Sequence, residues 1–352
     1  MSPRAVTHTH CAILRLLAWR EDVYPTFSSA DRRSAHTSAQ STRGEYRRDD
    51  VLVVAFIGLG AMGKPMAANL SAAGFNLRVF DVDAAATAAL VASDCQACET
   101  AVSAVGAADI VITMLPNDAI VEDFYIGPAG VLPALRAGTL LIDCSTISVE
   151  ATRRVAAAAT SAGMRIIDAP VSGGPRGAKD AILSFMVGGE ASDLANAEPL
   201  LRAMGRKIIH VGGSGTGQAA KICNNMLAAT ITAASAEALA LGVRNGIDPA
   251  ALTEVIQMSS GGNWMLDRWH PWPGVREDSP STHNYKGGFQ LKLMLKDLAL
   301  ATGNAQAMNA PTPLAALARS LYVLRSTQSA DALGKDFTCI QEMYVPGKTG
   351  AS

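Results

Sequence analysis

The sequence predicts an open, doubly wound α/β sheet followed by an all-α domain. Apolar segments of strand length alternate with helical segments up to residue 212, and a glycine-rich turn follows the first of them. No convincing strand pattern is found after residue 212. We therefore expect a sheet domain at 51–212 and a helical domain at 213–352, joined by one long helix.

Composition limits the classes of function. The chain has 352 residues, of which 49% are hydrophobic and 17% charged, and this balance is typical of a globular protein. Its formal net charge of −1 leaves no basic surplus for phosphate backbones, so no nucleic-acid partner is expected. No apolar run approaches the roughly 18 residues of a membrane span, so no membrane partner is expected. The six cysteines are too few for a disulfide framework, and we expect Cys95 and Cys98 to be incidental thiols in a reducing compartment.

Residues 1–50 differ from the rest of the chain. They are rich in Arg, Ser and Thr and have no sustained apolar period, as in a mitochondrial transit peptide, but they also contain six acidic residues, which such peptides lack. We favour a disordered tail or a start codon assigned too far upstream. The protein is then expected in the cytoplasm, or in the mitochondrial matrix if the segment is a transit peptide.

The elements follow in order. The continuously apolar segment 51–57 predicts a strand buried on both faces of a parallel sheet. A helix is expected at 64–70, and further strands at 77–80, 110–113, 139–143, 165–168, 183–187 and 207–211. Residues 218–241 contain no Gly or Pro and predict the long helix, and Asp248 with Pro249 begins the next one.

The glycine-rich turn GLGAMG, at 58–63, lies between the first strand and its helix, which is where a G-x-G-x-x-G turn binds a dinucleotide. Gly58 allows the tight turn, Gly60 lets a pyrophosphate approach the backbone, and Gly63 permits close packing of helix on strand. Asp81 follows the second strand, where a carboxylate bonds the ribose and repels a 2′-phosphate, so NAD is expected over NADP. The alternatives are a Rossmann-type turn without a dinucleotide, and a flavin.

Five separated motifs between residues 53 and 345 carry a family resemblance. They are FIGLGAMGKPM at 56–66, TMLP at 113–116 with DCST at 143–146, DAPVSGG at 168–174, GTGQAAKICNN at 215–225 and LKDL at 295–298. Through them the sequence resembles the β-hydroxyacid dehydrogenases. The resemblance implies a Rossmann-type domain, NAD as cofactor, a small-molecule 3-hydroxy acid as substrate, and a homodimer or homotetramer.

A narrower set of residues favours one branch of that family. PWPGV at 271–275, YKGGF at 285–289 and GKDF at 334–337 are similar to the branch that oxidises 3-hydroxyisobutyrate in valine breakdown. Sister enzymes that act on tartronate semialdehyde or glyoxylate remain an alternative. A cofactor-binding relative without catalysis is a third hypothesis.

Oxidation of an alcohol needs a hydride acceptor and a base for the hydroxyl proton. No histidine is well placed, and no metal-ligand spacing is found in the sequence, so no metal is expected. Lys221 lies among apolar neighbours on the long helix, where burial favours the neutral amine, and Asn225 shares its face. The resemblance gives the matching lysine the acid–base role. Asn225 would hold the substrate hydroxyl or orient the lysine. Without the motif, Lys221 and Asn225 would be expected simply to lie on a solvated face of the helix.

The resemblance also implies the remaining contacts. Around the cofactor it places Met62, Leu115, Pro116, Thr146 and Lys296. Alternatively, Lys296 only forms a salt bridge to a neighbouring carboxylate and does not contact the cofactor.

The substrate carboxylate is expected at Ser172, Gly173 and Gly174, whose backbone N–H groups can turn towards an anion, unless they form an ordinary glycine turn. The tryptophans of the helical domain either wall the pocket or pack between helices; they are Trp264, Trp269 and Trp272.

Overall fold

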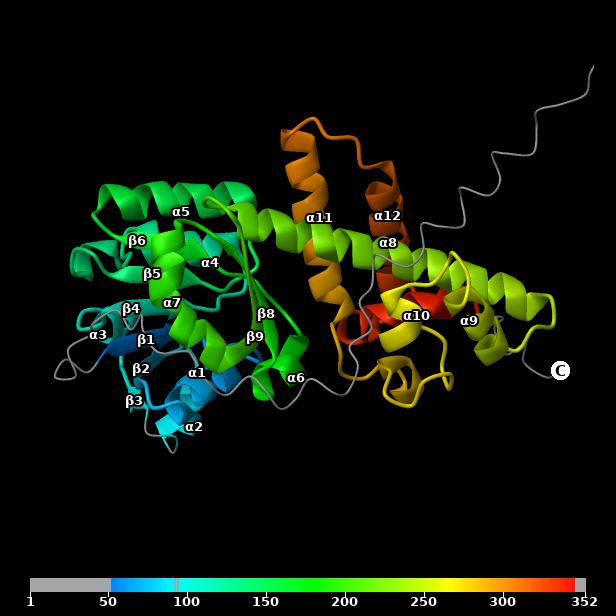
Figure 1. The fold of residues 1–352 in the computed structure, drawn as a ribbon, viewed down its shortest axis with the longest axis horizontal. Coiled ribbons are helices and arrows are strands. Elements are labelled where there is room, and N and C mark those ends of the chain that lie inside the picture. The colour runs from blue at the N-terminus through cyan, green and yellow to red at the C-terminus, as the bar shows by residue number, and fades with distance from the viewer. Residues whose placement is uncertain (1–51, 92, 94, 346–352) are drawn as a thin grey trace, which may run out of the picture. The chain divides into compact units, whose positions relative to one another are not determined.

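The first part of the chain forms a nine-stranded sheet in a computed structural model that describes residues 52–91, 93 and 95–345 (Figure 1). Its strands are β1 (Val53–Ile57), β2 (Asn76–Phe80), β3 (Gln96–Ala97), β4 (Ile110–Thr113), β5 (Leu140–Asp143), β6 (Arg165–Asp168), β7 (Val171–Ser172), β8 (Leu183–Gly188) and β9 (Gly205–Gly212). The strand order is β3-β2-β1-β4-β5-β6-β8-β7, and β9 pairs with β8. The predictions for residues 1–50 lie outside the described residues.

The sheet is parallel from β3 to β6 and mixed beyond it. β8 runs antiparallel to β6 and β7, whereas β9 runs parallel to β8. Chain order reverses between β1 and β4, so the carboxyl ends of these two strands open at the switch point where ligands bind in such sheets. The sequence predicts seven of these nine strands; it did not predict β3, β7 or the antiparallel pairings.

Helices cover both faces of the sheet. They are α1 (Gly63–Ala72), α2 (Ala84–Val91), α3 (Ala101–Val105), α4 (Asp118–Ile126), α5 (Val149–Ser161), α6 (Gly174–Lys179) and α7 (Ala191–Met204), with a 3-10 turn η1 (Leu132–Ala134). Val54 and Phe56 of β1 pack into one core with α1 and α7, and Ala55 and Ile57 pack into a second core with α3, α4 and α5. Because adjacent residues of β1 face opposite cores, the sheet is doubly wound, as predicted.

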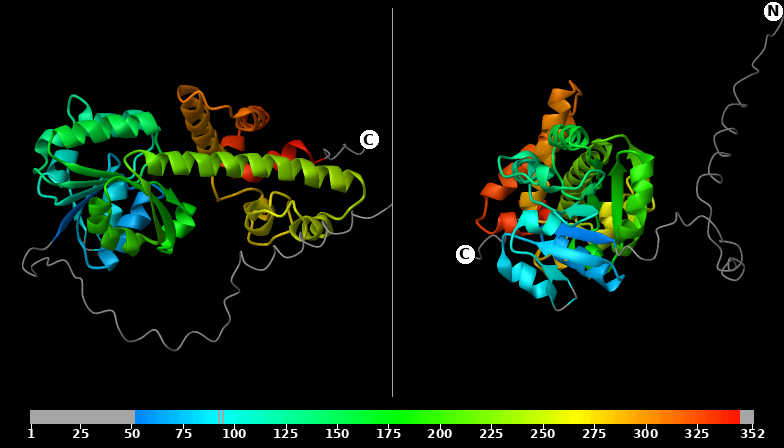
Figure 2. Two further views of the ribbon diagram at one scale, coloured as in Figure 1. Left: turned by 45° about the horizontal axis from the view of Figure 1, so that its top comes forward. Right: turned by 90° about the vertical axis from the view of Figure 1, so that its left-hand side faces the viewer.

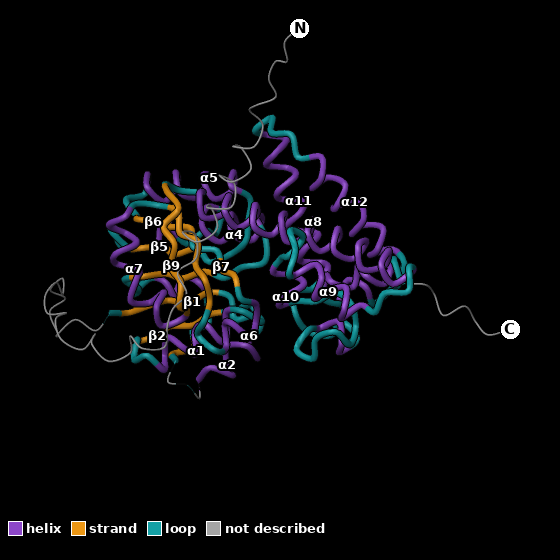
Figure 3. Tube along the Cα trace, turned by 45° about the vertical axis from the view of Figure 1, so that its right-hand side comes forward, coloured by secondary structure: helices purple, strands orange, loops and turns teal. Residues whose placement is uncertain are grey.

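The remaining part is helical and is organised along one helix. Its helices are α8 (Thr216–Arg244), α9 (Pro249–Gln257), α10 (Trp264–Arg268), α11 (Leu291–Ala307) and α12 (Pro313–Thr327), with 3-10 turns η2 (Pro280–His283), η3 (Ala332–Gly334) and η4 (Phe337–Met343). Figure 2 shows α8 running from the sheet through this part, and α11 and α12 pack against it. In Figure 3 the strands gather on one side and only helices and loops follow them, with one isolated bridge between Gln290 and Asp336.

By length and composition alone, α8 is long and apolar enough to cross a membrane. The expectation that no apolar run approaches the length of a membrane span was therefore wrong. The buried helix of a globular core passes the same test, and α8 packs against α11, α12 and η4. β9 ends at Gly212 and α8 begins at Thr216, but residues 51–352 cluster as one compact unit, so the division at residue 212 stays a prediction.

Candidate active site

The glycine-rich turn forms a cradle of exposed backbone after β1. Gly58 has φ +90°, and its N–H donates to Phe80 O at 3.0 Å. A Cβ atom on Gly63 would lie 1.8 Å from Gly58 O, whereas a Cβ on the exposed Gly60 would meet nothing within 4 Å. Met62 is half-buried and is the N-cap residue of α1. Helix and strand therefore pack tightly, while the backbone at Gly60 stays open to a phosphate group.

Asp81 is held directly beside this cradle. Its Oδ2 accepts from Leu59 N at 2.6 Å, and its Oδ1 accepts from Asp83 N at 2.8 Å. A carboxylate has about four lone-pair sites, so two backbone donors leave room for two ribose hydroxyls. The geometry fits a nucleotide with a free 2′-hydroxyl group.

Two loops at the carboxyl ends of β4 and β5 lie next to the cradle. A Cβ on Gly58 would lie 2.4 Å from Met114 O, which shows how closely the two segments approach. Leu115 N donates to Ser145 Oγ at 2.9 Å, and this bond ties the half-buried Leu115 to the loop that carries Thr146. A buried carboxylate fixes both strand ends, because Asp143 Oδ1 accepts from Thr113 Oγ1 at 2.8 Å and from Ser145 N at 3.1 Å.

Lys296 joins α11 to these loops. Its Nζ donates to Thr146 O at 2.6 Å and to Pro116 O at 3.4 Å. The same ammonium lies 3.6 Å from Asp297 Oδ1, so the salt bridge considered as an alternative also exists. Lys296 thus brings a positive charge from the helical part to the two loops expected to border the cofactor.

Lys221 is buried on the second turn of α8, with 6% of its surface exposed. Within the described part of the chain, no group hydrogen-bonds to its Nζ. Burial lowers the pKa of Lys221 from its ordinary 10.5; the charge of Asp297 opposes this shift and that of Lys296 adds to it. A buried amine without a hydrogen-bond partner and with a lowered pKa has the properties of a proton acceptor.

Asn225 and Asp297 form a cluster with Lys221 and Lys296, which we call the Lys221 corner. Asn225 lies one turn after Lys221, and its Nδ2 donates to Asp297 Oδ2 at 2.5 Å. The second oxygen of Asp297 is buried and accepts no hydrogen bond from any residue that the structure describes, although it pairs electrostatically with Lys296. Asp297 therefore both orients Asn225 and supplies a negative charge that acts on Lys221. No role for Asp297 is predicted from the sequence, although an acid between the leucines of the LKDL segment is a signal that could have identified it.

The small residues expected at the substrate carboxylate follow β7. Ser172 is half-buried and pairs with Ser184 of β8, a strand that α8 also contacts. Gly173 is exposed, and a Cβ on Gly174 would meet nothing within 4 Å. The turn thus lies on the part of the sheet that carries α8, with its backbone open to a ligand.

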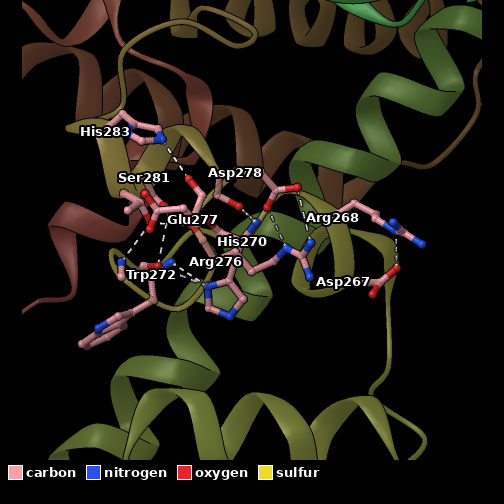
Figure 4. A network of polar contacts seen from close by, with 12 residues as sticks. Asp267, Arg268, His270, Trp272, Arg276, Glu277, Asp278, Ser281 and His283 are labelled. Atoms are coloured by element: carbon pink, nitrogen blue, oxygen red, sulfur yellow. Dashed lines mark hydrogen bonds and ion pairs between the residues drawn. The ribbon is translucent and has the colours of Figure 1, made fainter.

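The tryptophans do not form one wall. Trp264 and Trp269 stack with ring centroids 6.2 Å apart, but Trp264 is 62% exposed, whereas Trp269 packs into the helical core and donates from Nε1 to Asp336. Trp272 belongs to the neighbouring loop shown in Figure 4. Packing is thus observed for Trp269, while Trp264 presents a ring to solvent.

His270 organises that loop and is fully buried. Its Nδ1 accepts from Trp272 N at 3.1 Å, and its Nε2 lies 2.8 Å from Thr253 Oγ1 (Figure 4 shows the loop). Burial lowers the pKa of His270 to about 4, so at neutral pH the neutral ring accepts through Nδ1 and carries its hydrogen on Nε2. Both ring nitrogens thus have partners, Trp272 in the loop and Thr253 in α9, and His270 is not available as a base.

The other features fall outside this corner. His210 bonds Gly189 O and His283 bonds Glu277 O, and the remaining three histidines lie outside the described residues. No group of three or more His, Cys, Asp or Glu residues in the described ranges is placed to hold a metal ion. A recess between α5 and α11 is lined by residues that include Val149 and Met308, and none of the predicted site residues lines it.

A glycine cradle at the switch point of a doubly wound sheet, together with a buried lysine on α8, is the combination expected of an NAD-dependent oxidoreductase. Two family models match the chain. The NAD-binding domain of 6-phosphogluconate dehydrogenase matches residues 53–212, and the NAD-binding domain of NADP-dependent 3-hydroxyisobutyrate dehydrogenase matches residues 215–344.

The chain is also similar to individual proteins. It is 52% identical over 291 residues to the 3-hydroxyisobutyrate dehydrogenase of Pseudomonas aeruginosa, an alignment that covers 83% of this chain and 98% of the relative. The NAD-dependent L-serine dehydrogenase of the same species is 48% identical, with the same coverage. A solved structure of Mycobacterium tuberculosis 3-hydroxyisobutyrate dehydrogenase with L-serine matches with a TM-score of 0.80 and 42% identity, covering 84% of this chain and all of that one. The chain belongs to the β-hydroxyacid dehydrogenase family, as the sequence motifs predicted.

Proposed function

We propose that this enzyme oxidises the primary hydroxyl group of 3-hydroxyisobutyrate with NAD, to give methylmalonate semialdehyde in valine degradation. The observation that carries the proposal is the buried amine of Lys221, which lies without a hydrogen-bond partner, among the described residues, beside Asn225 and Asp297. The substrate is supported by the 52% identical relative named for that activity.

When bound, NAD supplies the hydride acceptor. The residues proposed to hold it are Gly58, Gly60, Met62, Gly63, Asp81, Leu115, Pro116, Thr146 and Lys296. Neutral Lys221 accepts the hydroxyl proton at Nζ. Burial lowers the pKa of Lys221, so the amine is neutral, and able to accept a proton, at a lower pH than an exposed lysine would be. Asn225 Oδ1 accepts one bond from Asn224 and has a second lone pair for the substrate hydroxyl.

The substrate carboxylate is proposed to lie against the backbone of Ser172, Gly173 and Gly174. The charge of Lys296 favours an anion in the same corner.

L-serine is the second candidate substrate. It shares the HO–CH2–CH–COO⁻ skeleton of 3-hydroxyisobutyrate and has an ammonium group in place of the methyl group. A relative at 48% identity is named for L-serine, and the M. tuberculosis structure was solved with it. Tartronate semialdehyde and glyoxylate remain alternatives by family analogy alone, and Lys221 with Asn225 argues against a non-catalytic relative.

Initial rates test these choices. We expect the highest kcat/KM with 3-hydroxyisobutyrate and NAD, compared with L-serine, glycerate and NADP. A tenfold preference for L-serine or glycerate would overturn the substrate, and no turnover of any of them would overturn the function. The cytoplasmic location and the homodimer or homotetramer stay predictions.

A further inference from the structure

The first turn of α8 is held to the sheet by a carboxylate at the end of β6. Asp168, the last residue of β6, accepts from Gly215 N at 2.7 Å through Oδ1 and from Gln218 N at 2.9 Å through Oδ2. The first N–H groups of a helix lack partners within the helix, and the N-cap residue Gly215 has no side chain to supply one. A Cβ on Gly217 would lie 2.7 Å from Asp168 Oδ2, so the helix has no room to move closer.

Gln218 fastens the same turn a second time, to a different loop. Its side chain is fully buried; Oε1 accepts from Ile147 N at 3.3 Å, and Nε2 donates to Ser145 O at 2.7 Å. These two partners flank Thr146, whose carbonyl accepts from Lys296. The side chain therefore joins α8 to the loop that carries Thr146, which is expected to border the cofactor.

We propose that Gln218 and Asp168 are positioning residues, which together set Lys221 against the cofactor loops. This inference rests on the proposed function. Lys221 lies three residues after Gln218, about 4.5 Å along the helix axis, so a shift of the first turn carries the amine with it. A displacement of about 1 Å at a reacting group lowers turnover by about 100-fold.

The Gln218→Glu variant gives a test that a merely structural role would not pass. A protonated Glu has one donor and one acceptor, like Gln, whereas its ionised form has no donor for Ser145 O. Burial raises the pKa of such a carboxyl group. We therefore expect the ratio of variant to wild-type kcat to be close to one at low pH and to fall about tenfold or more as pH rises. The dissociation constant of NADH, measured from NADH fluorescence, should stay within about threefold of the wild-type value. The reason is that the Gln218 side chain hydrogen-bonds only to backbone groups, and to no side chain that is proposed to hold the cofactor.

Two further variants complete the experiment. Gln218→Met should lower kcat about tenfold or more at every pH, because it loses both bonds. Thr232→Val removes a fully buried hydroxyl from the same helix, where Oγ1 donates to Ala228 O, and should leave kcat unchanged. A pH-independent ratio for Gln218→Glu, or a Gln218→Met enzyme with wild-type kcat, would overturn the proposal. Failure of the wild-type enzyme on every hydroxy acid would instead overturn the proposed function.

Discussion

The cofactor cradle and the corner around Lys221 are built in opposite ways. The cradle comes from one continuous segment, residues 53–81, and its chemistry lies in backbone groups that glycine leaves accessible. The corner around Lys221 joins side chains from α8 and α11 to loops after β4 and β5, and Asn225 and Asp297 are 72 residues apart. Backbone sites depend on local conformation, whereas this corner depends on how two parts of the fold meet. Substitutions should separate the two dependences.

The largest effect is expected for Lys221→Met. It removes the base and keeps most of the side-chain volume, so turnover should fall by about 100- to 10,000-fold. The NADH dissociation constant should stay unchanged, because the cradle lies elsewhere. Thermal stability should hold or rise, since a desolvated amine is replaced by an apolar chain. Rates, fluorescence titration and a melting curve measure the three quantities, and turnover at the wild-type rate would remove Lys221 from the mechanism.

A glycine pair tests the cradle in the same manner. Gly60→Ala should keep the melting temperature, because its Cβ meets nothing within 4 Å, but should raise KM for NAD about tenfold by blocking the approach of the phosphates. Gly63→Ala places a Cβ 1.8 Å from Gly58 O and should destabilise the fold by about 1–3 kcal/mol. Equal effects of the two substitutions on stability would contradict this division of roles.

This difference also explains what the sequence could predict. The alternation of strands and helices and the glycine spacing identified the doubly wound fold and the cradle, because both are local patterns. Lys221 and Asn225 could be paired because they share a helix face. Other features arise from tertiary packing, which spacing along the chain does not encode. They are the contact of Asn225 with Asp297, the hydrogen bonds of the Gln218 side chain, and the antiparallel pairing of β8.

The pH dependence tests the electrostatics of the Lys221 corner. Oxidation needs a neutral Lys221, so kcat/KM should rise with pH through a pKa below 10.5. Asp297 raises that pKa, and therefore Asp297→Asn should move the rising limb of the profile to lower pH while Asn225 keeps an acceptor. The exposed Asp267 serves as the control, since Asp267→Asn should leave the limb in place. A limb that moves to higher pH would contradict the assignment of Lys221 as the titrating base.

The smallest effect is expected at the far end of the cradle. Asp81→Asn removes the charge that would repel a 2′-phosphate, so the kcat/KM ratio of NADP to NAD should rise by about tenfold, the equivalent of one hydrogen bond to a charged group. Asp83→Asn is the matched control: this carboxylate lies two residues away and accepts from Ala85 N, at the start of α2. It should leave the ratio unchanged, because it lacks the bond to Leu59 that holds Asp81 beside the glycine turn. If both variants changed the ratio equally, the preference for NAD over NADP would come from the total negative charge around Asp81 and Asp83. Cofactor choice at the cradle would then depend on charges beyond its local backbone conformation, as the Lys221 corner depends on residues distant in sequence.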